Sequence, residues 1–427
     1  MGESSQTNHG PSTSGLSLAP LRGLRYTGSA ERLGRLLCPP YDVVDESHRR
    51  QLLGRDPHNA VALVLPEAED GADPYQHAAT ELAAWLADGT LGVDEQPALY
   101  VYEMRTAAGG RTRGLLGAVE LRAYADGVVL PHENTMAGPV ADRLALMTAT
   151  QANLEPIYLV YDGGGAASEA VAAADAREPI AVAQTPDGVT HRLWALTEPA
   201  LHRQIEADLT QRRAMIADGH HRYATYLEIQ ARYRAERGAG PWDRGLTLLV
   251  DSSSYGPEVH AIHRVLAGLD VAEAVSSAAE LCRVTDAPGP EEALVRAASI
   301  PGFAAVLTDG HRTAVLSDLD AKLRTGSLEP GEPGALGDLD VTVLHRGLLG
   351  PLWGLADTVE NVRYAHSVDD AVTLAREVGG CAVLLRPTPV AAVAAVAAAG
   401  ARMPRKSTLF TPKPASGLVM RRFEDQL

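Results

Sequence analysis

The chain has 427 residues, enough for two or three domains, and its 45% hydrophobic and 22% charged residues are typical of a globular protein. Lys and Arg number 38 and Asp and Glu 54, which leaves a formal net charge of −16. This acidic balance argues against broad binding to nucleic acid, because such binding needs a basic surface. A small basic pocket for a phosphate remains compatible with it.

The cysteines and the apolar stretches predict a soluble protein of a reducing compartment. Cys38, Cys282 and Cys381 are odd in number and far apart, so they form neither a disulfide framework nor a zinc pattern. The first residues lack the features of a secretory signal. The longest apolar stretch, 389–399, is too short to span a bilayer and predicts a buried helix. We expect a cytoplasmic protein that contacts neither membrane nor nucleic acid.

Segments typical of strands and of helices alternate along the chain. Residues 1–18 have almost nothing to bury and are expected to form a disordered tail. Short apolar runs predict strands, and apolar residues that recur every three or four positions predict helices. The expected strands are 59–65, 98–104, 113–121, 156–161, 191–196, 213–217, 246–250 and 382–385, and the expected helices are 75–87, 141–152, 198–209, 223–237, 271–282, 341–349, 368–378 and 390–399.

This alternation predicts a mixed α/β (α+β) fold. Breaks rich in Gly and Pro at 163–165 and 329–334 suggest where the chain divides. We therefore expect three regions after the tail. They are 19–162 with a His-Glu motif, 163–328 with an Asp-Gly-His-His-Arg motif, and 329–427 with a basic closing segment.

The sharpest chemical signal is a point where an expected strand runs into a helix. Asp218 and Gly219 form a turn there, and His220, His221 and Arg222 follow. Such a junction directs backbone N–H groups and the positive end of the helix dipole at one point. Arg222 can bind phosphate oxygens, the histidines add donors, and Asp218 can hold Mg²⁺. The alternative is an ordinary Asp-Gly turn with solvated histidines, but two histidines beside an arginine favour a phosphate site.

A second polar segment contains His132 and Glu133, which are candidate general bases. Glu133 is the candidate that takes a proton from a substrate hydroxyl. His132, together with Arg143 and Asn153 further along the chain, is expected to bind substrate. A polar loop followed by a solvated helix face explains these residues equally well.

A basic segment near the C-terminus contains Arg405 and Lys406, with Lys413 nearby. In an acidic protein this segment could close over an anion and neutralise donor phosphates or an acceptor carboxylate. A basic surface patch is the alternative.

Five motifs, in this order, resemble those of the family known as domain of unknown function 1015. The resemblance extends from about residue 18 to the C-terminus, and it departs from the expected pattern at Cys38 and Leu409. The motifs are Leu21–Tyr26, Pro39–Val44, Leu130–Glu133, Ile216–Tyr223 and Met403–Thr408.

The Asp-Gly-His-His-Arg run is also similar to a motif of free-serine kinases in the ParB/sulfiredoxin superfamily. This resemblance implies a ParB/sulfiredoxin-like nucleotide-binding core with additional α/β elements. It implies that Asp218 lies near the metal and that Gly219, His220, His221 and Arg222 meet the phosphates. An upstream glutamate acts as base in those kinases, and in this chain Glu133 is the candidate.

The leading functional hypothesis is a metal-dependent small-molecule kinase. It would move a phosphoryl group from ATP or ADP, with Mg²⁺, to the hydroxyl of a serine-like amino acid or related metabolite. The alternative from another class is a ParB-like nucleotide-binding switch or NTPase that acts through a protein partner. A hydrolase or phosphatase that uses the same pocket is a third possibility.

Overall fold

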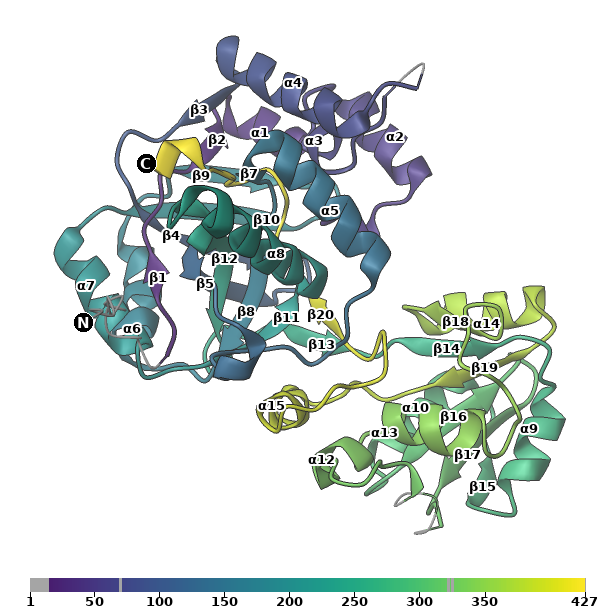
Figure 1. Ribbon diagram of the computed structural model, residues 1–427. Helices are drawn as coiled ribbons and strands as arrows, with labels where there is room; N and C mark the ends of the chain where they lie inside the picture. Colours follow the sequence, from purple (N-terminus) through teal and green to yellow (C-terminus); the bar gives the residue numbers. More distant parts are fainter. Residues whose placement is uncertain (1–14, 69–70, 321–322, 324–325, 427) are drawn as a thin grey trace, which may run out of the picture. The chain divides into compact units, whose positions relative to one another are not determined.

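The computed structural model describes residues 15–68, 71–320, 323 and 326–426 and has a mixed α/β fold (Figure 1). Its contacts divide it into two compact units. Unit 1 extends to Leu130, continues over Thr135–Pro257 and closes with the segment that begins at Pro412. Unit 2 consists of Pro131–Asn134 and Glu258–Thr411.

The boundaries of the two units differ from the breaks expected from composition. The glycine run 163–165 lies inside unit 1 and the Pro/Gly stretch 329–334 lies inside unit 2. The reason is strand pairing: β8 (Ile157–Tyr161) pairs with β12 (Arg244–Asp251) across the glycine run and joins both sides of it into one sheet. Glycine and proline mark where the chain turns, and the packing of distant elements decides which parts form one unit.

The described chain begins earlier than the expected end of the tail. Residues 1–14 of the tail lie outside the described residues. Leu16 and Leu18 are buried, and β1 (Leu18–Ala19) pairs with β5 (Arg111–Glu120).

Unit 1 is built on a nine-stranded sheet with the order β6-β11-β8-β12-β5-β4-β10-β9, to which β1 is added beside β5. Most neighbours are antiparallel, but β12 is parallel to β8 and β11 is parallel to β6. Two small pairs, β2–β3 and β7–β21, accompany it. The remaining strands are β2 (Leu24–Tyr26), β3 (Leu91–Val93), β4 (Leu99–Arg105), β6 (Val129–Leu130), β7 (Ala152–Asn153), β9 (Ala181–Gln184), β10 (Thr190–Leu196), β11 (Ala214–Asp218) and β21 (Arg421–Arg422).

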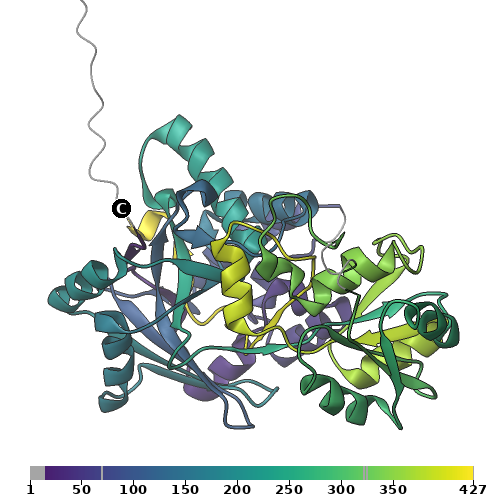
Figure 2. The same ribbon diagram turned by 90° about the horizontal axis from the view of Figure 1, so that it is seen from below.

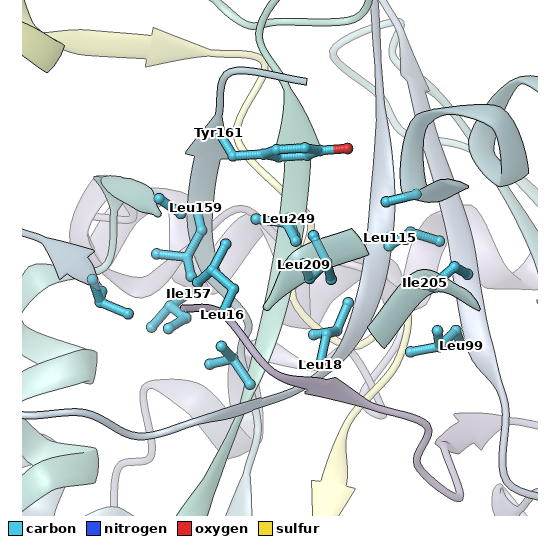
Figure 3. Close-up of a cluster of buried hydrophobic side chains, with 14 of the residues drawn as sticks. Leu16, Leu18, Leu99, Leu115, Ile157, Leu159, Tyr161, Ile205, Leu209 and Leu249 are labelled. Atoms are coloured by element: carbon cyan, nitrogen blue, oxygen red, sulfur yellow. The ribbon is translucent and has the colours of Figure 1, made fainter. Parts of the chain in front are cut away.

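One face of the central strands packs against an apolar cluster. Leu115, Leu159 and Leu249 belong to three neighbouring strands and meet Leu18 of β1 and Leu209 of α7 (Figure 3). The helices of unit 1 are α1 (Ala30–Leu36), α2 (Glu46–Arg55), α3 (Val61–Val64), α4 (Pro74–Ala87), α5 (Ala137–Thr150), α6 (Gly165–Ala173), α7 (Pro199–Leu209) and α8 (His220–Arg237).

The side chains of β4 that point to the opposite face of the sheet, those of Tyr100 and Tyr102, are buried as well. The hydroxyl of Tyr100 accepts a hydrogen bond from the N–H of Gly23 at 3.0 Å, and that of Tyr102 accepts one from Ala415 at 3.1 Å. Segments near both chain ends therefore cover these positions. A strand that is buried on both sides reads as a continuous apolar run, which is why β4 was predictable.

The expected strand at 59–65 is wrong, because this segment forms α3. The side chain of Asn59 accepts from the N–H of Val61 at 2.9 Å and donates to the carbonyls of Arg35 and Leu37. These bonds fix a helical turn at its start. Val61, Leu63 and Val64 are fully buried, and full burial removes the periodicity that distinguishes a strand from a short helix.

Unit 2 contains a six-stranded antiparallel sheet in the order β15-β17-β16-β19-β14-β18, with α9, α10 and α14 packed on it (Figures 1 and 2). The pair β13–β20 stands apart from this sheet. The expected helix at 341–349 forms α13 and a π-helical stretch, Val343–Leu349. The elements are β13 (Glu258–His260), β14 (His263–Leu266), α9 (Val271–Ala278), β15 (Arg283–Asp286), α10 (Pro290–Ala298), β16 (Ala304–Thr308), β17 (Thr313–Ser317), α12 (Gly334–Gly337), α13 (Asp340–Thr342), β18 (Val362–Ala365), α14 (Val368–Glu377), β19 (Cys381–Leu384), α15 (Val390–Ala398) and β20 (Leu409–Thr411).

Within the part of the chain that the structure describes, no helix has the length and apolar character needed to cross a membrane.

Candidate functional site

The turn between β11 and α8 is built around a glycine that no other residue replaces without strain. Gly219 has φ of 92°, in the left-handed region. A Cβ atom there would lie 3.1 Å from Nε of Arg222 and 3.2 Å from a methyl carbon of Ile157. The backbone therefore turns at once from Asp218 into the helix. We call residues 218–222 the β11–α8 junction.

The start of α8 presents its first backbone N–H groups at this junction. Gly219 offers no side-chain cap, and the first bond of the helix runs from the N–H of Tyr223 to the carbonyl of Gly219 at 2.9 Å. In every α-helix the N–H groups of the first turn point towards the start of the helix and away from its own carbonyls. Together with the helix dipole they favour an anion at this point.

The carboxylate of Asp218 is held by two basic side chains. One oxygen pairs with Arg222, and the other lies 2.6 Å from Nζ of Lys413. The same ammonium lies 3.0 Å from a carboxylate oxygen of Asp42. The side chains of Asp218 and Lys413 are only 11% and 14% exposed, so these pairs are poorly screened by solvent.

The carboxylates at the junction stabilise the charged forms of the two basic side chains. Burial lowers the pKa of Lys413, but the carboxylates of Asp218 and Asp42 outweigh it and raise the pKa above its ordinary value. Burial also lowers the pKa of Arg222, and Glu155 and Asp218 reverse that effect. Both side chains therefore stay cationic.

Arg222 is turned into the protein. Its Nη1 donates to the carbonyl of Pro156 at 2.6 Å while its Nη2 donates to Asp218. Its Nε has no hydrogen-bond partner among the described residues. In this arrangement the guanidinium ties the junction to the start of β8, and its contact with phosphate remains a prediction.

Tyr41, Arg143 and Glu155 form a further group of contacts next to Arg222. The guanidinium carbon of Arg143 lies 4.2 Å from the ring centre of Tyr41, and its Nη1 lies 3.7 Å from a carboxylate oxygen of Glu155. Glu155 also accepts from the N–H of Tyr41 at 3.0 Å and from the hydroxyl of Ser416 at 2.9 Å. Burial raises the pKa of Tyr41 to about 12, although Arg222 and Arg143 oppose the rise. Arg143 thus lies within the same cluster as the junction.

Two of the predicted site residues have clear partners in the fold. The Nε2 atom of His221 accepts from the N–H of Met136 at 3.1 Å, and His220 is buried. Asn153 is 1% exposed, and its Oδ1 accepts from the N–H of Leu246 and from Arg421, each at 3.2 Å. The amide of Asn153 thus joins β7, β12 and β21, which gives it a structural role beside the predicted contact with substrate.

The other predicted site residues lie together in unit 2. Glu133 accepts a hydrogen bond from the backbone N–H of Lys406, and Nε2 of His132 lies 3.0 Å from the hydroxyl of Thr408. Lys406 has φ of 54°, a conformation that costs energy in a residue other than glycine. The His-Glu motif and the basic closing segment, far apart in the sequence, are therefore neighbours.

Arg405 belongs to a network of hydrogen bonds that was not predicted from the sequence. Its Nη2 lies 2.9 Å from Asp357, whose other oxygen lies 3.0 Å from Nδ1 of His345. The Nε of the buried Arg264 donates to Nε2 of His345 at 2.9 Å. The hydrogen bond from His345, aided by Arg405, lowers the pKa of Asp357 to about 2, whereas burial lowers the pKa of His345.

A resident magnesium ion does not fit the junction. Both oxygens of Asp218 are engaged by basic side chains. Among the described residues, no three side chains of His, Cys, Asp or Glu are grouped so that they could hold a metal ion. Magnesium sites with only one or two carboxylates complete their shell with water and phosphate oxygens, but here both oxygens of the Asp218 carboxylate already have cationic partners.

These observations show a mixed α/β protein with a set of poorly exposed ion pairs at the β11–α8 junction. The chain belongs to the family described as protein of unknown function, DUF1015, whose model matches residues 18–342. The family predicted from the five motifs is thereby confirmed.

Solved structures that resemble the chain do so loosely, and no curated protein matches it. A variant of a free serine kinase in complex with AMP has a TM-score of 0.37 and 16% identity over 70% of this chain and 90% of that chain. The same kinase in complex with ADP has a TM-score of 0.36, with the same identity and coverage. A conserved hypothetical protein from Pyrococcus furiosus has a TM-score of 0.34 and 16% identity over 70% of this chain and 94% of that chain. Similarity at this level assigns no function.

Proposed function

We propose that the chain is a phosphotransferase that moves a phosphoryl group from ATP or ADP to the hydroxyl of a serine-like amino acid or a related metabolite. The observation that carries this proposal is the β11–α8 junction. There an anion-attracting helix start adjoins a carboxylate held by Arg222 and Lys413. The similarity of residues 218–222 to the motif of free-serine kinases points in the same direction.

Phosphoryl transfer depends mainly on positioning and on neutralising charge. In this proposal the first N–H groups of α8 bind oxygens of the donor phosphate, and His220 and His221 add donors. Asp218 keeps its orientation through its two ion pairs. Predicted roles for Arg405 and Lys406 are the neutralisation of donor phosphates or of an acceptor carboxylate.

Glu133 is the proposed general base. It takes the proton of the acceptor hydroxyl, the hydroxyl oxygen forms a bond to the terminal phosphorus, and the bond to the bridging oxygen breaks. The products are a phosphomonoester and ADP or AMP, with the electron pair on the leaving phosphate. Mg²⁺ enters this proposal as a companion of the nucleotide phosphates, whose charge it would neutralise.

A nucleotide-binding switch is the second candidate. The start of α8 supports it as well, because the N–H groups of a helix start can bind nucleotide phosphates without any transfer.

The experiment follows the terminal phosphate of labelled ATP and ADP in the presence of hydroxylated amino acids. Label on a small molecule supports the kinase, label released as phosphate indicates a hydrolase, and unchanged nucleotide with measurable binding indicates the switch. Asp218→Asn should remove the transfer. Asp243→Asn is the matched control, because Asp243 pairs with Arg234 near the other end of α8.

A further inference from the structure

The chain uses lysine very sparingly. Only three of its 38 Lys and Arg residues are lysines, namely Lys322, Lys406 and Lys413. Arginine fills the other basic positions, and lysine differs from it in presenting a compact ammonium in place of a planar guanidinium.

The C-terminal segment is also attached by residues other than Lys413. The next residues already attach it: the N–H of Ala415 donates to Tyr102 at 3.1 Å, and the hydroxyl of Ser416 donates to Glu155 at 2.9 Å. Backbone bonds between Ser416 and Cys38 reinforce this attachment. Its attachment therefore does not depend on the ion pairs of Lys413 alone.

The ammonium of Lys413 lies where two carboxylates converge. Its nitrogen is 2.6 Å from Asp218 and 3.0 Å from Asp42, and its side chain is 14% exposed. Placing a charge at such a position costs desolvation energy, which the two carboxylates offset. A guanidinium would spread its donors over a wider fork than one point between two oxygens.

We propose that the ammonium of Lys413 occupies the position between Asp42 and Asp218 where a divalent ion would otherwise bind. It neutralises the two carboxylates as such an ion does at carboxylate pairs in other proteins. It is a positioning residue, because it keeps the Asp218 carboxylate oriented at the β11–α8 junction. The part of the inference that concerns activity rests on the proposed phosphotransfer, and the part that concerns cation binding does not.

The test measures the melting temperature of the full chain, without nucleotide, in the presence and absence of Mg²⁺, together with luminescence of added Tb³⁺. The wild type should show no shift with Mg²⁺. Lys413→Met should be destabilised, and Mg²⁺ should restore several degrees because an ion now enters between the two carboxylates. Adding Asp42→Asn to this variant should abolish the restoration.

Two controls separate this effect from the general loss of a positive charge. Arg25→Met removes a partly buried cation from another aspartate, Asp94, and should gain no response to Mg²⁺. Lys413→Arg keeps the charge and should remain without a divalent response. A wild type that responds to Mg²⁺ as strongly as Lys413→Met would overturn the inference. So would a Lys413→Met variant that unfolds equally with and without Mg²⁺.

The Mg²⁺ dependence of the transfer rate separates the role of Lys413 from the proposed function. If the wild type transfers phosphate, Lys413→Met should need at least tenfold more Mg²⁺ for half-maximal rate, with the rate recovering at high Mg²⁺. If the wild type transfers no phosphate, the proposed function fails while the melting experiment still decides the role of Lys413.

Discussion

Gly219 combines two demands at one residue, a left-handed backbone and close contact with its neighbours. Gly219→Ala should cost about 2–3 kcal/mol of unfolding free energy, since it adds steric contacts with Arg222 and Ile157 to backbone strain. Urea denaturation measures this. Gly127→Ala is the control, because Gly127 is also left-handed, with φ of 64° and ψ of 23°, but its Cβ would meet no atom within 4 Å, so it should cost only about 1 kcal/mol. Equal losses would show that packing at the junction is unimportant.

Glu133→Gln tests the proposed base with little change to the fold. The amide oxygen of Gln can still accept the hydrogen bond from Lys406 that Glu133 accepts, so the variant should remain folded. It should bind nucleotide as the wild type does and lose phosphoryl transfer by two orders of magnitude or more, about the contribution of a general base. Calorimetric titration and the transfer assay measure the two effects. Normal turnover would remove Glu133 from the mechanism.

At the scale of residues, site residues that are adjacent in the sequence could be predicted, and contacts between distant residues could not. The run 218–222 was visible because its residues are adjacent and follow an apolar strand. The convergence of Asp42, Asp218 and Lys413 was not, because 371 positions separate the first from the last and no periodicity connects them. The proline-rich turn before Asp42 and the basic segment before Lys413 were the only signals present.

At the scale of elements, predictability followed the environment of each segment. The strands β4, β5, β8 and β12 were predicted because each contains a short apolar run. The run at 59–65 was read as a strand because its helix is a single buried turn, fixed by the side chain of Asn59 and by no pattern of its own.

Asn153 acts between elements, and its substitution separates a structural role from the predicted contact with substrate. Asn153→Ala leaves the N–H of Leu246 and part of Arg421 without acceptors in a buried place. We expect a loss of about 1–3 kcal/mol in unfolding free energy with an unchanged KM. A raised KM at unchanged stability would instead support the substrate contact.

At the scale of the whole molecule, acid should destabilise both units through buried histidines. Burial lowers the pKa of His191 in unit 1 and of His263 in unit 2 to about 4. Between about pH 4 and 6.5 the two histidines are protonated in the unfolded chain and neutral in the folded chain. The free energy of unfolding should therefore fall as the pH drops from about 6.5 towards 4. Each histidine should contribute about 2–3 kcal/mol over this interval. Urea denaturation at pH 7.5 and 4.5 measures the change, and His191→Gln should reduce it.

The class of fold was predictable for the whole molecule, and its division into units was not. Alternating strand-like and helix-like segments predict a mixed α/β protein. Unit 2, however, includes the short stretch Pro131–Asn134 from the middle of unit 1. Such an exchange depends on contacts between distant segments, as between Glu133 and Lys406, that no local composition records.

The most direct test of the central claim is a phosphorus NMR assay of the purified chain with Mg²⁺, ATP or ADP, and a panel of hydroxy amino acids that includes serine. We expect a new phosphomonoester resonance with one acceptor, absent in Asp218→Asn and retained in Asp243→Asn. Nucleotide that stays intact with every acceptor, while it binds the protein, would contradict the phosphotransferase and leave the switch. A resonance that persists in Asp218→Asn would place the chemistry away from the β11–α8 junction.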